Sequence, residues 1–256
     1  MISPLQSRFF RAPALLTATA IALAGCASVE GAGMSDAGVY DPHEPTNRAV
    51  HRFNVGLDRA VLRPVSTGYD AVVPDGVQTM VGNASDNLGE PSNLVNCTLQ
   101  GDLRGAGVAL YRFVVNSTVG LGGIYDVAAE FGVTADETDF GETLHTWGGG
   151  EGAYVELPVL GPSTTRDATG RVVDAVLNPL STVMNSDQKT LRTSLKVADR
   201  VGSRARYGDT LDSVLYESTD SYSQTQLLYL QNRRFELGIE NEDSYIDPTE
   251  IDTEGF

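Results

Sequence analysis

Apolar residues recur at helical spacing along most of the chain. They stand three and four positions apart, which places them on one face of an α-helix. From this pattern we predict helices over 45–63, 75–88, 92–99, 166–177, 189–215 and 221–237. Pro64 is expected to end the first helix, and Gly89, Glu90 and Pro91 should separate the second from the third. Strand patterns are rare, so the predicted fold class is mainly α.

The stretch 106–129 is the most apolar part of the chain after its N-terminal segment. Gly120, Gly122 and Gly123 should divide it into an apolar helix, a turn and a second short apolar segment. A helix that is apolar nearly all round is either buried in a core or lies against lipid. Composition alone favours burial in a core.

Arg112 and Asn116 stand inside this apolar stretch and argue against a membrane-spanning helix. Arg112 has two interpretations. It is either a salt-bridged or snorkelling side chain on a packed helix, or a cation that lines a polar passage and meets phosphate head groups.

Residues 134–165 are rich in glycine and proline, with a short apolar run between them. This composition predicts a long loop or hairpin with one extended piece and no helix. Long loops in compact domains are usually functional.

The N-terminal segment has the pattern of an export signal. Arg8 and Arg11 precede a short run of small and apolar residues that ends in Leu-Ala-Gly-Cys at Cys26. This ending resembles a bacterial lipobox, so we predict a signal peptide over 1–25, acylation of the Cys26 thiol and a flexible tether over 26–40. Ala27 favours delivery to the outer membrane. The alternative is an ordinary cleaved signal peptide with a chance cysteine.

Charge limits the class of partner. The chain has 18 Lys+Arg and 34 Asp+Glu, a formal net charge of −16, which argues against nucleic acid as a partner. Residues 236–256 hold eight acids and no base, so we expect a disordered acidic tail after an ordered domain over 41–235.

Motifs for catalysis are weak. The chain has three histidines, none with metal-ligand spacing, so we predict neither a metal nor a cofactor. A hydrolase triple of Ser163, His145 and Asp139 can be assembled on paper, but a chain of this size offers many such triples. The residues favour binding or conduction over chemistry.

An ordered set of motifs resembles the MlaA family, also called VacJ lipoproteins. The resemblance covers about 41–180 and includes D-P-H-E-P-T-N-R from Asp41, N-L-G-E-P-S-N-L-V-N from Asn87, R-F-V-V-N-S-T-V-G-L-G-G from Arg112 and W-G-G-G-E-G-A-Y-V-E-L-P from Trp147. It implies a single ring-like helical domain that lies in the membrane leaflet and carries a glycine-rich hairpin loop.

The resemblance also implies a function without covalent chemistry. Phospholipids mislocalised to the outer leaflet of the outer membrane would pass through an amphipathic channel to a periplasmic lipid carrier, MlaC, beside a trimeric outer-membrane porin. The alternative is a structural porin-associated lipoprotein without transport.

Candidate site residues follow from the same resemblance. Arg112 and Asn116 are expected to turn inward to the channel and meet head groups. Gly148, Gly150 and Gly152 are expected to be hinges of the hairpin loop, or else plain turn residues.

Overall fold

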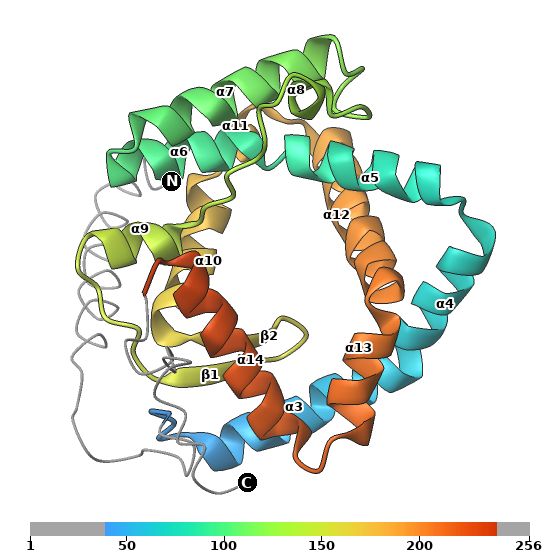
Figure 1. Cartoon of the computed structure of the whole chain (residues 1–256), viewed down its shortest axis with the longest axis vertical. Helices are drawn as coiled ribbons and strands as arrows, with labels where there is room; N and C mark the ends of the chain where they lie inside the picture. The colour runs from blue at the N-terminus through green and yellow to red at the C-terminus, as the bar shows by residue number, and fades with distance from the viewer. Residues whose placement is uncertain (1–38, 240–256) are drawn as a thin grey trace, which may run out of the picture.

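The helices form a ring around a central space (Figure 1). The computed structural model describes residues 39–239. The signal peptide, Cys26 and residues 240–256 of the expected tail lie outside the described residues. The mainly α, ring-like fold predicted above is confirmed.

The first half of the described chain is mostly helical. Its elements are α3 (Glu44–Leu57), the π-helical turn η1 (Asp58–Leu62), α4 (Arg63–Val72), α5 (Asp75–Asn87), α6 (Glu90–Gln100), α7 (Leu103–Thr118) and α8 (Val127–Glu130). The α6 and α7 helices pack against each other, and α5 contacts α7.

The second half contains one hairpin and the longest helix. Its elements are α9 (Phe140–Thr146), β1 (Tyr154–Leu157), β2 (Gly161–Thr164), α10 (Thr165–Leu177), α11 (Leu180–Val183), α12 (Ser186–Arg206), α13 (Gly208–Asp212), the π-helical turn η2 (Ser213–Glu217) and α14 (Ser221–Glu236). The α12 helix returns along α4 and α5 and so completes one side of the ring (Figure 1).

Several of these helices begin at a residue whose polar side chain caps the first turn. Asp102 accepts the Arg104 N–H at α7, and Thr164 accepts the Asp167 N–H at α10. At α12 Asn185 and Gln188 form a reciprocal capping box. Such caps satisfy backbone N–H groups that the first helical turn leaves without partners.

The prediction that Pro64 ends the first helix is wrong. The chain stays helical from Glu44 to Val72, with η1 just before the proline. In η1 the Arg63 N–H donates to the Asp58 carbonyl, five residues back. A return from π to α geometry leaves one carbonyl without a helical donor, so the missing N–H of Pro64 is tolerated there.

Residues 134–165 contain a helix that composition did not predict. The α9 helix is capped by Asp139 and packs on α10. A Cβ on Gly170 would lie 2.3 Å from the Gly141 nitrogen, so these glycines permit close contact between two helices. The expected hairpin is present as β1 and β2, with Tyr154 opposite Thr164 and Leu157 opposite Gly161.

The long helix expected over 189–215 is divided. The α12 helix ends at Arg206, and α13 and η2 follow it. The predicted helices over 75–88, 92–99, 166–177 and 221–237 are confirmed to within two residues at each boundary.

The apolar α7 helix is not buried as composition favoured. Its buried positions are Gly105, Ala106, Ala109, Arg112 and Asn116, which are small or polar. Several of its large apolar side chains are exposed, with Leu103 at 80%, Leu110 at 49% and Val114 at 49%. Across residues 39–239 no helix is both long and apolar enough to cross a membrane.

Candidate functional site

The ring encloses a cavity of about 1250 Å³. Its walls come from α3, η1, α5, α6, α10, α12 and α14, together with the loop before α9 and the β1–β2 turn. Segments far apart in the sequence therefore share one interior surface. This convergence makes the cavity the candidate functional site.

One group of lining residues is apolar. It includes Leu57, Val61, Leu62, Val159, Leu160 and Val197, from α3, η1, the β1–β2 turn and α12. These side chains supply hydrocarbon surface inside the ring. A purely aqueous passage has no need of such a surface.

Three cations line the same cavity without a carboxylate partner. Arg171, Lys196 and Arg200 are exposed, and none of them forms an ion pair within residues 39–239. Lys196 and Arg200 lie one turn apart on α12. Although the Lys196 side chain is exposed to the cavity, desolvation by the surrounding walls lowers its pKa, and the charge of Arg192 lowers it further. These donors are available to an anionic group that enters the cavity.

Acids also line the cavity, among them Asp86 on α5, which packs against α12, and Glu137 on the loop before α9. Burial within the ring raises the pKa of Asp86 to about 6, and the charges of Glu137 and Asp199 add to the effect. Asp86 therefore keeps its proton to a higher pH than an ordinary aspartate does.

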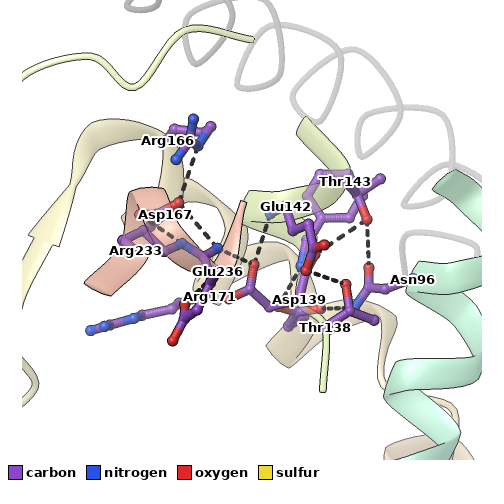
Figure 2. A network of polar contacts seen from close by, with 12 residues as sticks. Asn96, Thr138, Asp139, Glu142, Thr143, Arg166, Asp167, Arg171, Arg233 and Glu236 are labelled. Carbon is purple, nitrogen blue, oxygen red and sulfur yellow. Dashed lines mark hydrogen bonds and ion pairs between the residues drawn. The ribbon is translucent and has the colours of Figure 1, made fainter. Parts of the chain in front are cut away.

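A network centred on Arg233 makes part of the cavity wall (Figure 2). Arg233 is 9% exposed and lies on α14. Its Nη2 donates to Asp139 Oδ1 at 2.7 Å, its Nη1 donates to Glu236 Oε2 at 3.1 Å, and its Nε lies 3.3 Å from Asp167 Oδ2 without a hydrogen bond. The network joins α9, α10 and α14.

Asp167 is the shared carboxylate of this network. Arg166 Nε donates to it at 3.1 Å, and the Tyr229 hydroxyl donates to it at 2.6 Å. Burial alone would raise the pKa of Asp167, but the Tyr229 hydrogen bond and the charges of Arg233 and Arg166 outweigh burial and lower it. The group stays ionised and is held between the two arginines.

The Arg112 side chain lies in the contact between helices and not in the cavity. It is 3% exposed. Its Nε donates to Glu90 Oε1 at 2.6 Å, its Nη1 to the Val133 carbonyl at 2.7 Å and its Nη2 to Asp126 Oδ2 at 3.0 Å. It is not among the residues that line the cavity.

Asn116 extends the same contact. Its side chain donates to Asp126 Oδ1 at 2.9 Å and accepts the Ala128 N–H at 2.9 Å. These contacts favour the packed-helix interpretation of Arg112, and Asn116 takes part in the same packing. Head-group binding by Arg112 or Asn116 stays a prediction.

The loop glycines differ in what they require. Gly148 and Gly152 have φ values of 88° and 75°, which favour glycine, whereas Gly150 has neither a positive φ nor a close neighbour. A Cβ on Gly149 would lie 2.8 Å from the Leu144 carbonyl oxygen. Hinge motion at Gly148, Gly150 and Gly152 stays a prediction.

The hydrolase triple is not assembled by any of the described contacts. The Asp139 carboxylate caps α9 and pairs with Arg233, and the fully buried Ser163 hydroxyl donates to the Thr164 carbonyl.

Comparison with protein families identifies the fold. A family model described as "MlaA lipoprotein" matches residues 39–236, which is nearly the whole described chain. The chain belongs to the MlaA lipoprotein family. This confirms the resemblance drawn from the motifs.

Several relatives share most of their length with this MlaA-family chain. "Intermembrane phospholipid transport system lipoprotein MlaA" of Escherichia coli (strain K12) is 35% identical over 220 residues, which cover 83% of each chain. A protein of Rickettsia bellii named only as uncharacterized is 34% identical over 186 residues, or 72% of each chain.

A solved structure shares the fold. It is described as "Structural basis for maintenance of bacterial outer membrane lipid asymmetry", and it matches with a TM-score of 0.67 and 31% identity. The match covers 77% of this chain and 98% of the other.

Sequence reasoning missed most of the cavity lining of this MlaA-family ring. Lys196 and Arg200 had a detectable signal, because two cations one turn apart on an amphipathic helix share a face. Val159 and Leu160 had none beyond their place in a glycine- and proline-rich loop.

Proposed function

We propose that this protein removes mislocalised phospholipids from the outer leaflet of the outer membrane through its central cavity. It passes them to the periplasmic carrier MlaC and so maintains lipid asymmetry. The relatives named as intermembrane phospholipid transport lipoproteins support this proposal. No step makes or breaks a covalent bond in the lipid.

The observation that supports the proposal is that both cationic and apolar side chains line the cavity. A phospholipid has an anionic phosphate and apolar chains, and the cavity offers both matching surfaces. Lys196, Arg200 and Arg171 are the cations free to meet the phosphate. The apolar side chains from η1 and the β1–β2 turn suit the acyl chains.

The outer surface supports a position within one leaflet. The exposed apolar row on α7 continues into the segment after it, where Leu121 is 66% and Tyr125 is 50% exposed. An exposed apolar surface, together with the absence of a spanning helix over residues 39–239, suits burial in half a bilayer. Acylation of Cys26 would anchor the ring at the periplasmic face of the outer membrane, beside a trimeric porin.

The experiment is complementation of a strain that lacks the gene. Outer-leaflet phospholipid is measured through enzymatic palmitoylation of lipopolysaccharide. Deletion should raise it and the wild-type gene should restore it, whereas Cys26→Ser should not restore it because the ring would lose its anchor. Lys196→Glu with Arg200→Glu should also fail, because the carboxylates would repel phosphate.

The competing function is a structural lipoprotein that binds porin without transport. It predicts that the charge-reversed variant restores the strain as well as the wild type does, provided both are equally abundant. Lys189→Glu, on the same helix but outside the cavity lining, is the matched control and should restore the strain. Full restoration by the Lys196 and Arg200 double variant would contradict the transport proposal.

A further inference from the structure

The tip of the β1–β2 hairpin has an unusual composition for its backbone. The three residues between the strands are Pro158, Val159 and Leu160. Val159 has a φ of 68°, in the left-handed region. That region disfavours β-branched residues most strongly, and glycine would adopt it without strain.

The side chains of Val159 and Leu160 at this tip are not buried in the protein core. Val159 is 67% exposed and Leu160 is 52% exposed, and both line the central cavity. Figure 1 shows the turn reaching from the strands toward the centre of the ring. The Val159 and Leu160 side chains are therefore exposed to the cavity, and the backbone at Val159 is strained.

Asn54 holds the tip in place. Its Oδ1 accepts the Val159 N–H at 2.8 Å, and its Nδ2 donates to the Leu157 carbonyl at 3.0 Å and to Glu156 Oε1 at 3.1 Å. Both ends of one amide side chain on α3 are thus committed to the hairpin. The strained conformation is supported by a neighbouring element, as strain retained at functional sites usually is.

We propose that the Val159–Leu160 tip is the acyl-chain contact of the cavity. It is an apolar finger, positioned by Asn54, against which the fatty-acyl chains of a diacyl phospholipid lie. Leu57, Val61 and Leu62 of α3 and η1 line the same cavity and supply further apolar surface for the chains. The inference rests on the proposed function and assigns it a specificity-determining element.

The charge distribution makes the acyl chain the matching part of the lipid. Arg171 Nη2 donates to the Pro162 carbonyl at 3.4 Å, which places this cation on the hairpin next to the tip. A phosphate held by Arg171 would leave its attached chains within reach of the apolar tip. The tip itself offers no polar side chain to a head group.

The test measures phospholipid retained by the purified full-length lipoprotein. Protein in detergent is mixed with micelles that contain diacyl phosphatidylethanolamine, and bound lipid is quantified after gel filtration. Val159→Asn with Leu160→Asn should retain about tenfold less lipid than wild type, because the apolar burial of two side chains is lost. Val159→Leu with Leu160→Met keeps an apolar tip and should retain the wild-type amount.

Two further variants separate this effect from misfolding. Val159→Gly relieves the backbone strain while it removes the side chain, so it should melt no lower than wild type and still retain less lipid. Val183→Asn, at a position 76% exposed and outside the cavity lining, should retain the wild-type amount.

The outcomes distinguish the two proposals. Equal retention by the wild type and the Asn–Asn variant would overturn the role of the tip and leave lipid binding by the cavity intact. A wild-type protein that retains no phospholipid would overturn both. Reduced retention by the Asn–Asn and Gly variants, with normal retention by the apolar and Val183 variants, supports the tip.

Discussion

At the scale of single residues, the interior of the ring changes the chemistry of ordinary side chains. Asp86 is exposed to the cavity, yet the surrounding walls and the charges of Glu137 and Asp199 raise its pKa to about 6. Ionisation of Asp86 therefore costs the folded state free energy. The penalty is absent below the usual pKa of an aspartate and is complete once the pH has risen past about 6.

We predict that Asp86→Asn stabilises the protein at neutral pH only. The amide cannot ionise, so the melting temperature should rise at about pH 7.5 and stay unchanged at about pH 4, where the native carboxyl is protonated in the folded state. Circular dichroism at the two pH values measures this. Glu217→Gln, at an exposed position outside the cavity lining, should show no such difference. An equal shift at both pH values would contradict the elevated pKa.

At the scale of elements, buried charge joins the helices where apolar packing is scarce. The α6–α7 pair and α8 meet around Arg112, which contacts Glu90 and Asp126. The buried apolar residues of α7 are the small Ala106 and Ala109, whereas several of its large apolar side chains are exposed. The helix contact thus depends on the ion pairs.

We predict that Arg112→Leu destabilises the fold by about 3 kcal/mol, because it leaves the Glu90 carboxylate buried without its partner. Arg112→Leu combined with Glu90→Met should recover much of the loss, since both charges are then removed. Urea unfolding followed by helical circular dichroism measures both variants. Wild-type stability in Arg112→Leu would instead leave head-group binding as the role of Arg112.

At the scale of the whole molecule, the ring is closed by polar contacts between the two ends of the described chain. Arg204 of α12 makes two parallel hydrogen bonds to Asp58 of η1, each at 2.9 Å, and the Tyr216 hydroxyl of η2 donates to the same carboxylate. Burial alone would raise the pKa of Asp58, but Arg204 and Tyr216 overcome this effect and lower it. Stability from this contact is therefore present at neutral pH and lost as the pH falls through the depressed pKa.

We predict that Asp58→Asn loosens the closure of the ring. Amide hydrogen exchange should become faster in η1 and in η2 together, although the two segments lie far apart in the sequence, and unfolding stability should fall by about 3 kcal/mol. Glu151→Gln removes a less buried ion pair with Arg234 and should cost under about 1 kcal/mol. Faster exchange in η1 alone would show that the contact does not join the two ends.

Much of the helical content could be predicted because helix formation is encoded locally. Periodicity located most helices, and the caps Asp102, Thr164 and Asp220 lie at their starts. The prediction was wrong at Pro64 and Gly141, because proline and glycine usually interrupt a helix and here they do not. A π turn absorbs the proline, and the glycine serves a contact with a distant helix.

Most of the helices, the family and the chemical character of each segment follow from the sequence, because spacing and composition are properties of neighbouring residues. Which side chains face the cavity follows only from the tertiary structure. Arg112 and Lys196 are both cations on helices, yet one is sealed by Glu90 and Asp126 and the other stands open to the interior. A ring has an inner and an outer surface, and both accept apolar residues, so periodicity cannot tell which face of a helix is inside.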